Sequence, residues 1–226
     1  MSRLFIVLND LSDFDFGPLL KKHLGGHEVD IGVSPPCRPS DYRLVLLWSY
    51  HRIIKEIPQP NNIILFHSSD LPKGRGWAPI YNAIAQAESE FVVSGIFAAK
   101  DVDAGDIIVK ARFPIEPFHM GSDLRRFDSE LSIMLTAMIL KRFEGRQICG
   151  SPQRGSPTTY PRRKPEDNMI DPDEKLSDVY QRLRACEPNA PAFFVKDGVR
   201  FELSLKTTTP APLPTNIQIR FGEDGE

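Results

Sequence analysis

A histidine and a carboxylate form the first pair of side chains in this sequence that could carry out proton chemistry. His67 directly follows the apolar run 62-NIILF-66, and Asp103 stands 36 positions later in the turn 101-DVDAGD-106. A carboxylate beside an imidazole fixes the tautomer of the ring and makes it an effective proton acceptor. Strand-end histidines and acidic turns are also common as ordinary solvated features, and spacing alone does not bring these two residues together.

The stretch after His67 has the composition of a substrate-binding loop. It reads 68-SSDLPKGRG-76 and contains one proline and two glycines. Ligand-binding loops of α/β sheets lie at the carboxyl ends of parallel strands, which is where this loop is expected. Its two cations are either solvated surface charges or contacts for an anionic acceptor. We predict that five residues contact the substrate: Ser69, Lys73, Arg75, Gly76 and Asn82.

Strand and helix patterns alternate over the first 150 residues. Strands are predicted at 3–9, 27–33, 43–50, 62–66, 91–99 and 107–115, and helices at 17–26, 51–57, 78–88 and 123–145. The nearly continuous apolar run 43-RLVLLWSY-50 is typical of a parallel strand that is covered on both faces. The alternation predicts a doubly wound α/β sheet that is mostly parallel. Asp123 is expected to cap the long helix and Gly145 to end it.

The composition changes after residue 150. The stretch 150-GSPQRGSPTTYPRRKPED-167 is rich in Pro, Ser, Gly and Arg, which predicts a linker that crosses the surface. A helix over 173–187 and a hairpin over 192–203 follow, the hairpin turning at Asp197-Gly198. We therefore divide the chain into a catalytic α/β domain, residues 1–150, and a small C-terminal α+β lobe, residues 151–226.

Composition also limits the classes of partner. The chain has 28 Lys and Arg against 30 Asp and Glu, so no basic field for nucleic acid is expected. Its three widely spaced cysteines favour neither disulfides nor a zinc site, and we predict no bound metal. The apolar run 4-LFIVL-8 precedes acidic residues and indicates a buried strand rather than a signal peptide. We expect a cytoplasmic protein without membrane contact.

Two separated motifs resemble the folate-dependent formyltransferases. This family includes the methionyl-tRNA, glycinamide ribonucleotide and sugar-nucleotide formyltransferases. The stretch 67-HSSDLPKGRG-76 is similar to its His-x-Ser-x-Leu-Pro-x-x-x-Gly pattern, and 102-VDAGD-106 is similar to its Leu-Asp-x-Gly-Asp pattern. The interval between the two motifs also matches the family. The likeness covers roughly residues 40 to 205 and is greatest to the sugar-nucleotide N-formyltransferases.

The resemblance implies a Rossmann-like formyltransferase fold and transfer of a formyl group from 10-formyltetrahydrofolate to a primary amine. It assigns His67 as the catalytic histidine and Asp103 as its carboxylate partner. It also implies a folate pocket, formed partly by backbone groups, whose residues come from two loops: His51, Arg52, Ile53, Asp101, Val102 and Gly105.

One position departs from the family pattern. An asparagine stands two positions before the histidine in the family, whereas this sequence has Leu65. Removing one oxyanion donor costs about a hundredfold to a thousandfold in rate. Either Asn82 or a backbone N–H of the Ser68-Ser69 turn replaces the donor, or the chain is a catalytically impaired folate-binding homologue. For Asn82 the plainer interpretation is that it faces solvent or caps a local turn.

The expected acceptor is the amino group of an amino-sugar nucleotide, in the biosynthesis of lipopolysaccharide O-antigen or a related surface polysaccharide. The near-neutral charge and the small C-terminal lobe weigh against a tRNA acceptor, which requires a basic surface. A methionyl-tRNA formyltransferase-type enzyme remains the alternative. A homodimer is compatible with the sequence.

Overall fold

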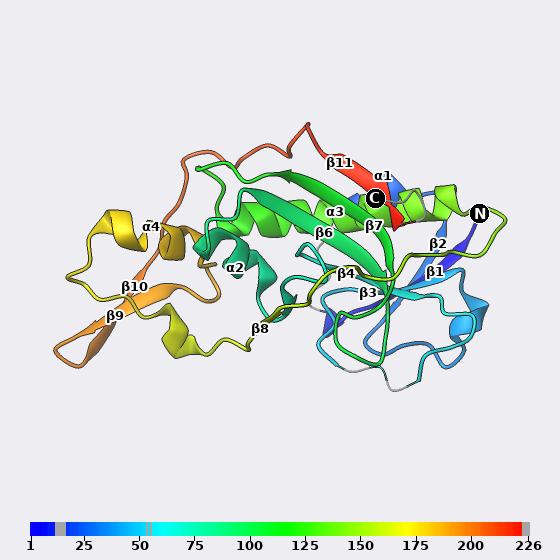
Figure 1. Cartoon of the computed structure of the whole chain (residues 1–226), viewed down its shortest axis with the longest axis horizontal. Helices are drawn as coiled ribbons and strands as arrows, with labels where there is room; N and C mark the ends of the chain where they lie inside the picture. Colours follow the sequence, from blue (N-terminus) through cyan, green and yellow to red (C-terminus); the bar gives the residue numbers. More distant parts are fainter. Residues whose placement is uncertain (12–16, 53, 55, 223–226) are drawn as a thin grey trace.

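A seven-stranded sheet forms the centre of the molecule (Figure 1). The computed structural model describes residues 1–11, 17–52, 54 and 56–222. The strand order is β11-β7-β6-β4-β3-β1-β2. The strands of this sheet are β1 Arg3–Val7, β2 Glu28–Gly32, β3 Leu44–Leu47, β4 Ile63–His67, β6 Glu90–Phe97, β7 Ile107–Pro114 and β11 Gln218–Phe221.

The sheet combines a parallel half with an antiparallel half. Neighbouring strands are parallel from β2 through β1 and β3 to β4. The pairs β4–β6, β6–β7 and β7–β11 are antiparallel. Five strands, β1, β2, β3, β4 and β7, therefore run one way, while β6 and β11 run the other. The predicted α/β class with a mostly parallel sheet is confirmed. The edge strand β11 was not predicted.

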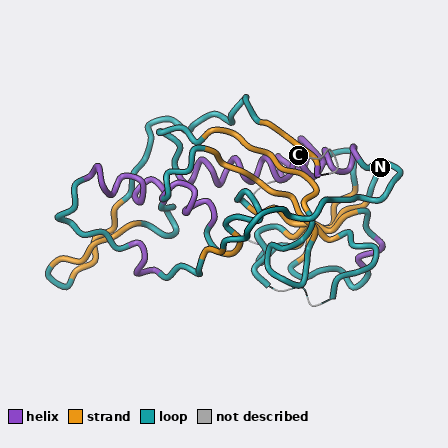
Figure 2. The backbone as a smooth tube through the Cα atoms, viewed as in Figure 1, coloured by secondary structure: helices purple, strands orange, loops and turns teal. Residues whose placement is uncertain are grey.

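Helix α3 covers one face of the sheet (Figure 2). Its buried residues Leu124, Phe127, Leu131 and Leu135 recur every three or four positions and pack on the strands. The helix begins at Gly121, so the prediction that Asp123 is the N-cap is wrong. Asp123 lies in the first turn instead, where its carboxylate accepts the Met120 N–H at 3.1 Å. The helices are α1 Gly17–Leu24, α2 Pro79–Ala85, α3 Gly121–Arg142 and α4 Leu176–Ala185, with 3-10 helices at Pro39–Asp41 and Pro165–Asn168.

Loops cover the opposite face. Side chains alternate along β4, so Ile64 and Phe66 pack toward α3, whereas Leu65 lies with His67 on the loop side. The loop face is therefore where the predicted catalytic residues lie.

No helix among the described residues is both long and apolar enough to cross a membrane.

The predicted helix over residues 51–57 is wrong for the part that the structure describes. Residues 51, 52, 54, 56 and 57 have loop conformation. Pro58 and Pro60 follow, and a residue before proline favours extended backbone. Because a seven-residue segment is also short for a helix, local propensity does not outweigh this restriction.

The C-terminal part of the chain has two roles. Helix α4 and the hairpin of β9 (Ala192–Lys196) and β10 (Val199–Leu203) lie at one end of the molecule, at the left of Figure 1. The hairpin is confirmed, and Asp197 and Gly198 take the positive φ values of 53° and 77° that a tight turn requires. The same part of the chain supplies β11 to the central sheet. The division at residue 150 stays a prediction.

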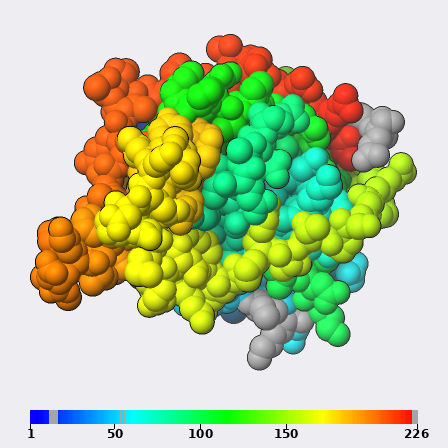
Figure 3. All heavy atoms as spheres, turned by 60° about the vertical axis from the view of Figure 1, so that its left-hand side comes forward, coloured from blue at the N-terminus to red at the C-terminus, as the bar shows by residue number. Residues whose placement is uncertain are grey.

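The predicted linker is part of the main domain's surface. Residues 150–165 cross it as a band that changes from lime to yellow in Figure 3. Here β8 (Thr159–Tyr160) pairs in parallel with β5 (Arg75–Gly76). The segment is therefore fixed by backbone pairing to the loop that follows His67.

Candidate active site

The structure brings His67 and Asp103 together. His67 is the last residue of β4, where it pairs with Ser94 of β6. Its Nδ1 atom lies 3.4 Å from Oδ2 of Asp103, which stands in the turn between β6 and β7. The two side chains are only 8% and 11% exposed. Solvent ions therefore screen their interaction weakly.

The second nitrogen of the His67 ring faces a backbone oxygen. Nε2 lies 2.7 Å from the carbonyl oxygen of Gly74, so it must carry the hydrogen of this bond. In a neutral ring Nδ1 would then be a bare acceptor facing the Asp103 carboxylate. A hydrogen on Nδ1 would point at that carboxylate. Because both ring nitrogens face oxygen atoms of the protein, one of the two contacts must open before the ring can act on a substrate.

The Asp103 turn has a backbone that few sequences allow. Asp103 itself has a φ of 52°, a left-handed conformation that Asp tolerates better than most residues. A Cβ atom at Gly105 would lie 1.8 Å from the Phe97 carbonyl oxygen, so glycine is required there. The Gly76 N–H donates to Asp103 Oδ2 at 2.9 Å. This bond fixes the carboxylate between the ring of His67 and the substrate loop.

Gln153 also holds this turn through hydrogen bonds, and no sequence pattern predicted that role. Its Nε2 group donates to the carbonyl oxygens of Asp103 and Gly105 at 2.7 and 2.8 Å. Its Oε1 atom accepts from Arg75 at 2.6 Å. One amide therefore joins the linker, the acidic turn and the substrate loop. Only the folded structure reveals this contact, because residue 153 lies 50 positions from Asp103 in the sequence.

Most of the predicted substrate residues make structural contacts. The Ser69 hydroxyl donates to the Lys73 carbonyl oxygen at 2.8 Å. Arg75 binds Gln153, and Gly76 binds Asp103. The Asn82 amide donates to the carbonyl oxygens of Trp77 and Ala78, which agrees with the local-cap interpretation. Among these predicted residues, the side chain of Lys73 is exposed and has no hydrogen bond or ion pair within the described part of the chain.

Four of the six predicted folate residues are exposed at the rim, whereas Gly105 is buried. His51 and Arg52 are exposed, Asp101 is exposed and Val102 is 60% exposed. Ile53 lies outside the described residues. Trp77 is 40% exposed. Its ring is 5.8 Å from the His51 ring, and the Arg162 guanidinium lies over it at 4.8 Å. Flat aromatic surface is thus available beside the substrate loop.

The sequence is similar to curated methionyl-tRNA formyltransferases. That of Koribacter versatilis is 34% identical over 181 residues, which cover 77% of this chain and 58% of the relative. That of Moorella thermoacetica is 27% identical over 176 residues, with shares of 75% and 56%. This chain therefore spans somewhat more than half the length of the relatives it matches. No protein-family model matches the chain.

The chain belongs to the folate-dependent formyltransferase family. Solved structures share its fold. A 4-N formyltransferase from Francisella tularensis has a TM-score of 0.72 and 15% identity over 92% of this chain and 98% of its own. HypX from Aquifex aeolicus, in complex with tetrahydrofolic acid, has a TM-score of 0.71 and 20% identity over 91% of this chain and 37% of its own.

Leu65 takes the place of the asparagine expected for this formyltransferase-family site. Its half-buried side chain packs with buried Leu71, Ile96 and Ile107 on the loop face. Two of the predicted substitute donors are engaged in local hydrogen bonds. The amide of Asn82 is engaged at the start of α2, and the Ser69 N–H donates to the His67 carbonyl oxygen at 3.0 Å. The ring of His67 is a further N–H donor in this part of the site.

A second carboxylate, that of Asp128 on α3, lies close to the end of β4. The Ser68 hydroxyl donates to Asp128 of α3 at 2.8 Å. Burial raises the pKa of Asp128 above its usual range, and the Ser68 hydrogen bond and nearby Arg125 oppose the rise. Asp128 also borders a small hollow with Trp48 and Ser49, at the ends of β3 and β4. This side of the site was not predicted.

Proposed function

We propose that this chain transfers a formyl group from 10-formyltetrahydrofolate to a primary amine. The observation that carries the proposal is the shielded contact between His67 and Asp103 at the carboxyl end of β4. The names of its sequence relatives, methionyl-tRNA formyltransferases, and the fold it shares with a solved 4-N formyltransferase support the same reaction class.

Each residue of the pair has a defined role in the proposal. The folate cofactor supplies the formyl group when it is bound. His67 presents an N–H toward the formyl oxygen, where negative charge develops, once the Gly74 carbonyl has moved away. Asp103 keeps the ring oriented and balances its positive charge. The proton that the attacking amine loses passes first to the Asp103 carboxylate, and the pair returns it to the folate nitrogen that departs as its bond to the formyl carbon breaks.

The rim residues fit a flat, partly apolar cofactor. Exposed Trp77 lies beside the ring of His51, and the side chain of Val102 is exposed on the acidic turn. Aromatic faces bind flat heterocycles by stacking. In this proposal the pterin contacts His51, Arg52, Ile53, Asp101, Val102 and Gly105, partly through their backbone groups.

The acceptor we propose is an amino-sugar nucleotide for lipopolysaccharide or a related surface polysaccharide. The charge balance supports it, because the chain carries 28 basic against 30 acidic residues and so has no excess of positive charge for a nucleic acid. Lys73 is exposed on the substrate loop and is free to pair with a phosphate of such an acceptor. We place the reaction in the cytoplasm. Light scattering will test whether the chain is a homodimer.

An aminoacylated tRNA is the second candidate acceptor. A specific observation favours it, because curated proteins similar in sequence to this chain carry the name methionyl-tRNA formyltransferase. The two acceptors differ in salt dependence. Binding of a nucleic acid backbone weakens steeply with salt, whereas a small nucleotide with two phosphates depends on salt much less.

The test is a turnover assay with 10-formyltetrahydrofolate and two panels of acceptors, amino-sugar nucleotides and methionyl-tRNA. We expect formation of tetrahydrofolate with at least one amino-sugar nucleotide, and its loss in Asp103→Asn. Turnover with methionyl-tRNA alone would select the second candidate. Folate binding without turnover in either panel would select a binding protein and overturn the enzyme proposal. Hydrolysis without an acceptor is the background to subtract.

A further inference from the structure

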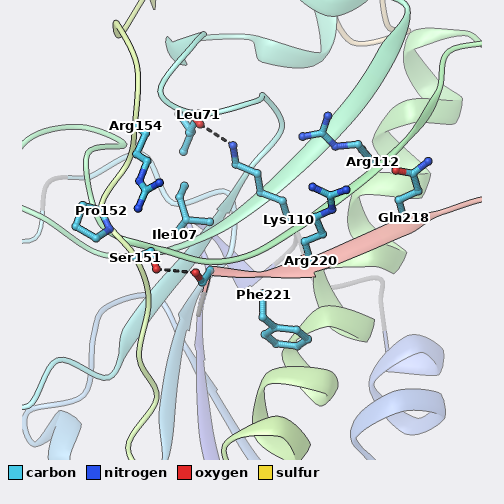
Figure 4. Close-up of a pocket in the computed structure, with 11 residues that line it drawn as sticks. Leu71, Ile107, Lys110, Arg112, Ser151, Pro152, Arg154, Gln218, Arg220 and Phe221 are labelled. Atoms are coloured by element: carbon cyan, nitrogen blue, oxygen red, sulfur yellow. Dashed lines mark hydrogen bonds between the residues drawn. The ribbon is translucent and has the colours of Figure 1, made fainter. Parts of the chain in front are cut away.

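A second cavity opens on the loop face of the sheet, away from His67 (Figure 4). It measures about 320 Å³ and lies between β7, β11 and residues 151–154. Four cationic side chains line it: Lys110, Arg112, Arg154 and Arg220. In Figure 4, Arg154 comes from the linker on one side, and the other three come from β7 and β11.

The strand register places this cavity relative to the active site. His67 of β4 pairs with Ser94 of β6, Ser94 with Lys110 of β7, and Lys110 with Arg220 of β11. Neighbouring strands lie about 4.8 Å apart, so Arg220 is three strands, or about 14 Å, from His67. The side chain of Leu71 and the strand β6 lie between the two regions. The cavity is thus distinct from the site around the histidine.

The cations of the cavity are only partly balanced. Lys110 lies 2.6 Å from an oxygen of Asp70, and Arg112 lies 3.6 Å from the same oxygen. Arg112 also reaches Glu90 at 3.4 Å. Arg154 and Arg220 have neither an ion pair nor a side-chain hydrogen bond among the residues that the structure describes. Two guanidinium groups therefore face the cavity with all their donors free.

The arrangement opposes stability unless an anion is present. Lys110 and Arg220 are direct partners across two strands, and like charges at such positions destabilise a sheet. Arg112 and Gln218 form the next pair along the same strands. A multiply charged anion would offset the repulsion among several of these side chains at once. Arginine forks bind phosphate oxygens in pairs, which suits a ligand that bridges the two sides.

We propose that this cavity binds a pyrophosphate group. Its volume is at the lower end of the roughly 300–1,000 Å³ of small-molecule sites. Cations on both sides of the cavity favour two linked phosphates over one. The group comes either from inorganic pyrophosphate or from a nucleoside diphosphate. The inference does not depend on the reaction at His67.

The binding test uses isothermal titration of the full chain at low salt with three probes. Pyrophosphate and uridine diphosphate share the two phosphates, and uridine lacks them. We expect both phosphate compounds to bind and uridine not to bind. Equal affinities for the first two assign recognition to the phosphates alone, and tighter binding of the nucleotide adds a nucleoside contact. Absence of pyrophosphate binding overturns the proposal.

The site is located by variants. Arg154→Gln with Arg220→Gln should weaken pyrophosphate binding roughly a hundredfold, at roughly tenfold for each arginine, since each loses charge-assisted hydrogen bonds. Lys196→Gln with Lys206→Gln removes the same net charge from the exposed hairpin region and should leave the affinity unchanged. Arg154→Lys with Arg220→Lys should lose less than the glutamine pair. Equal affinity in the glutamine pair and its control, with both chains folded by circular dichroism, overturns the proposal.

Discussion

The pair of His67 and Asp103 and the cationic cavity lie on one face of the same sheet. Their charged groups differ in burial and in how completely they are paired. His67 and Asp103 are nearly enclosed, and each of their contacting atoms has a partner. The cavity is open and its cations outnumber its acids. Enclosure with complete pairing fixes the geometry that proton transfer requires, whereas unpaired donors leave binding capacity for an ion. Location on the ligand-binding face of the sheet therefore does not by itself define the role of a residue.

The largest effect is expected at the enclosed pair. His67→Ala and Asp103→Ala should each lower turnover by about 10²–10⁴-fold, because general acid–base catalysis contributes that much. Circular dichroism and thermal unfolding will verify that each variant is folded. Lys196→Gln with Lys206→Gln is the control and should keep its turnover. Wild-type turnover in Asp103→Ala would contradict the assigned role, and a loss of pyrophosphate affinity in the same variant would break the separation between the two regions.

Leu65→Asn tests whether the enclosed pair lacks a donor. If no other group stabilises the formyl oxygen, the new amide should raise turnover, by up to about a hundredfold to a thousandfold. Leu65→Ala removes the same apolar contacts with Leu71 and Ile96 but adds no donor, so it controls for the altered packing. Unchanged turnover in the asparagine variant would mean that a donor is already in place.

Gln153 and Arg154 are neighbours that report on different regions. Gln153→Ala removes the side-chain donor that binds the backbone carbonyl oxygens of Asp103 and Gly105. This loss should lower the free energy of unfolding by about 1–3 kcal/mol. It should also lower kcat more than it raises KM, because the acidic turn loosens. Arg154→Gln should change stability by no more than about 0.5 kcal/mol. Urea unfolding measures both, and equal losses would argue against this division.

The smallest effect concerns pH. Because burial raises the pKa of Asp128, the folded chain binds this proton more tightly than the unfolded chain does. Its contribution to the free energy of unfolding therefore falls as pH rises from its ordinary value of 3.8 through the raised pKa. Asp128→Asn should flatten that decline, as unfolding by urea at pH 5 and pH 8 will show. Identical pH dependence in both chains would mean that the carboxylate is better solvated than its burial indicates.

Local sequence patterns were sufficient to single out His67 and Asp103, which the structure brings into contact, and to predict most of the sheet. The apolar run that ends at His67 and the acidic turn around Asp103 are each readable within a few residues, and strand order brings them together. Gln153, β8 and β11 were missed because their roles come from partners far away in the chain. Gln153 lies in a Pro- and Ser-rich stretch that is typical of a linker. Its role becomes visible only when β8 is seen to pair with β5. The short 218-QIRF-221 is likewise too brief to stand out as a strand.

The pairing of β11 with β7 also affects how the chain folds. Residues 3–7 and 218–221 belong to one sheet, so the sheet joins segments more than two hundred positions apart. Such long-range pairing is slow, and during synthesis β7 is an open edge until residue 218 emerges from the ribosome. An open edge exposes unpaired backbone groups that can join another chain. Fragments that end before Gln218 should therefore aggregate during expression, although they retain both His67 and Asp103.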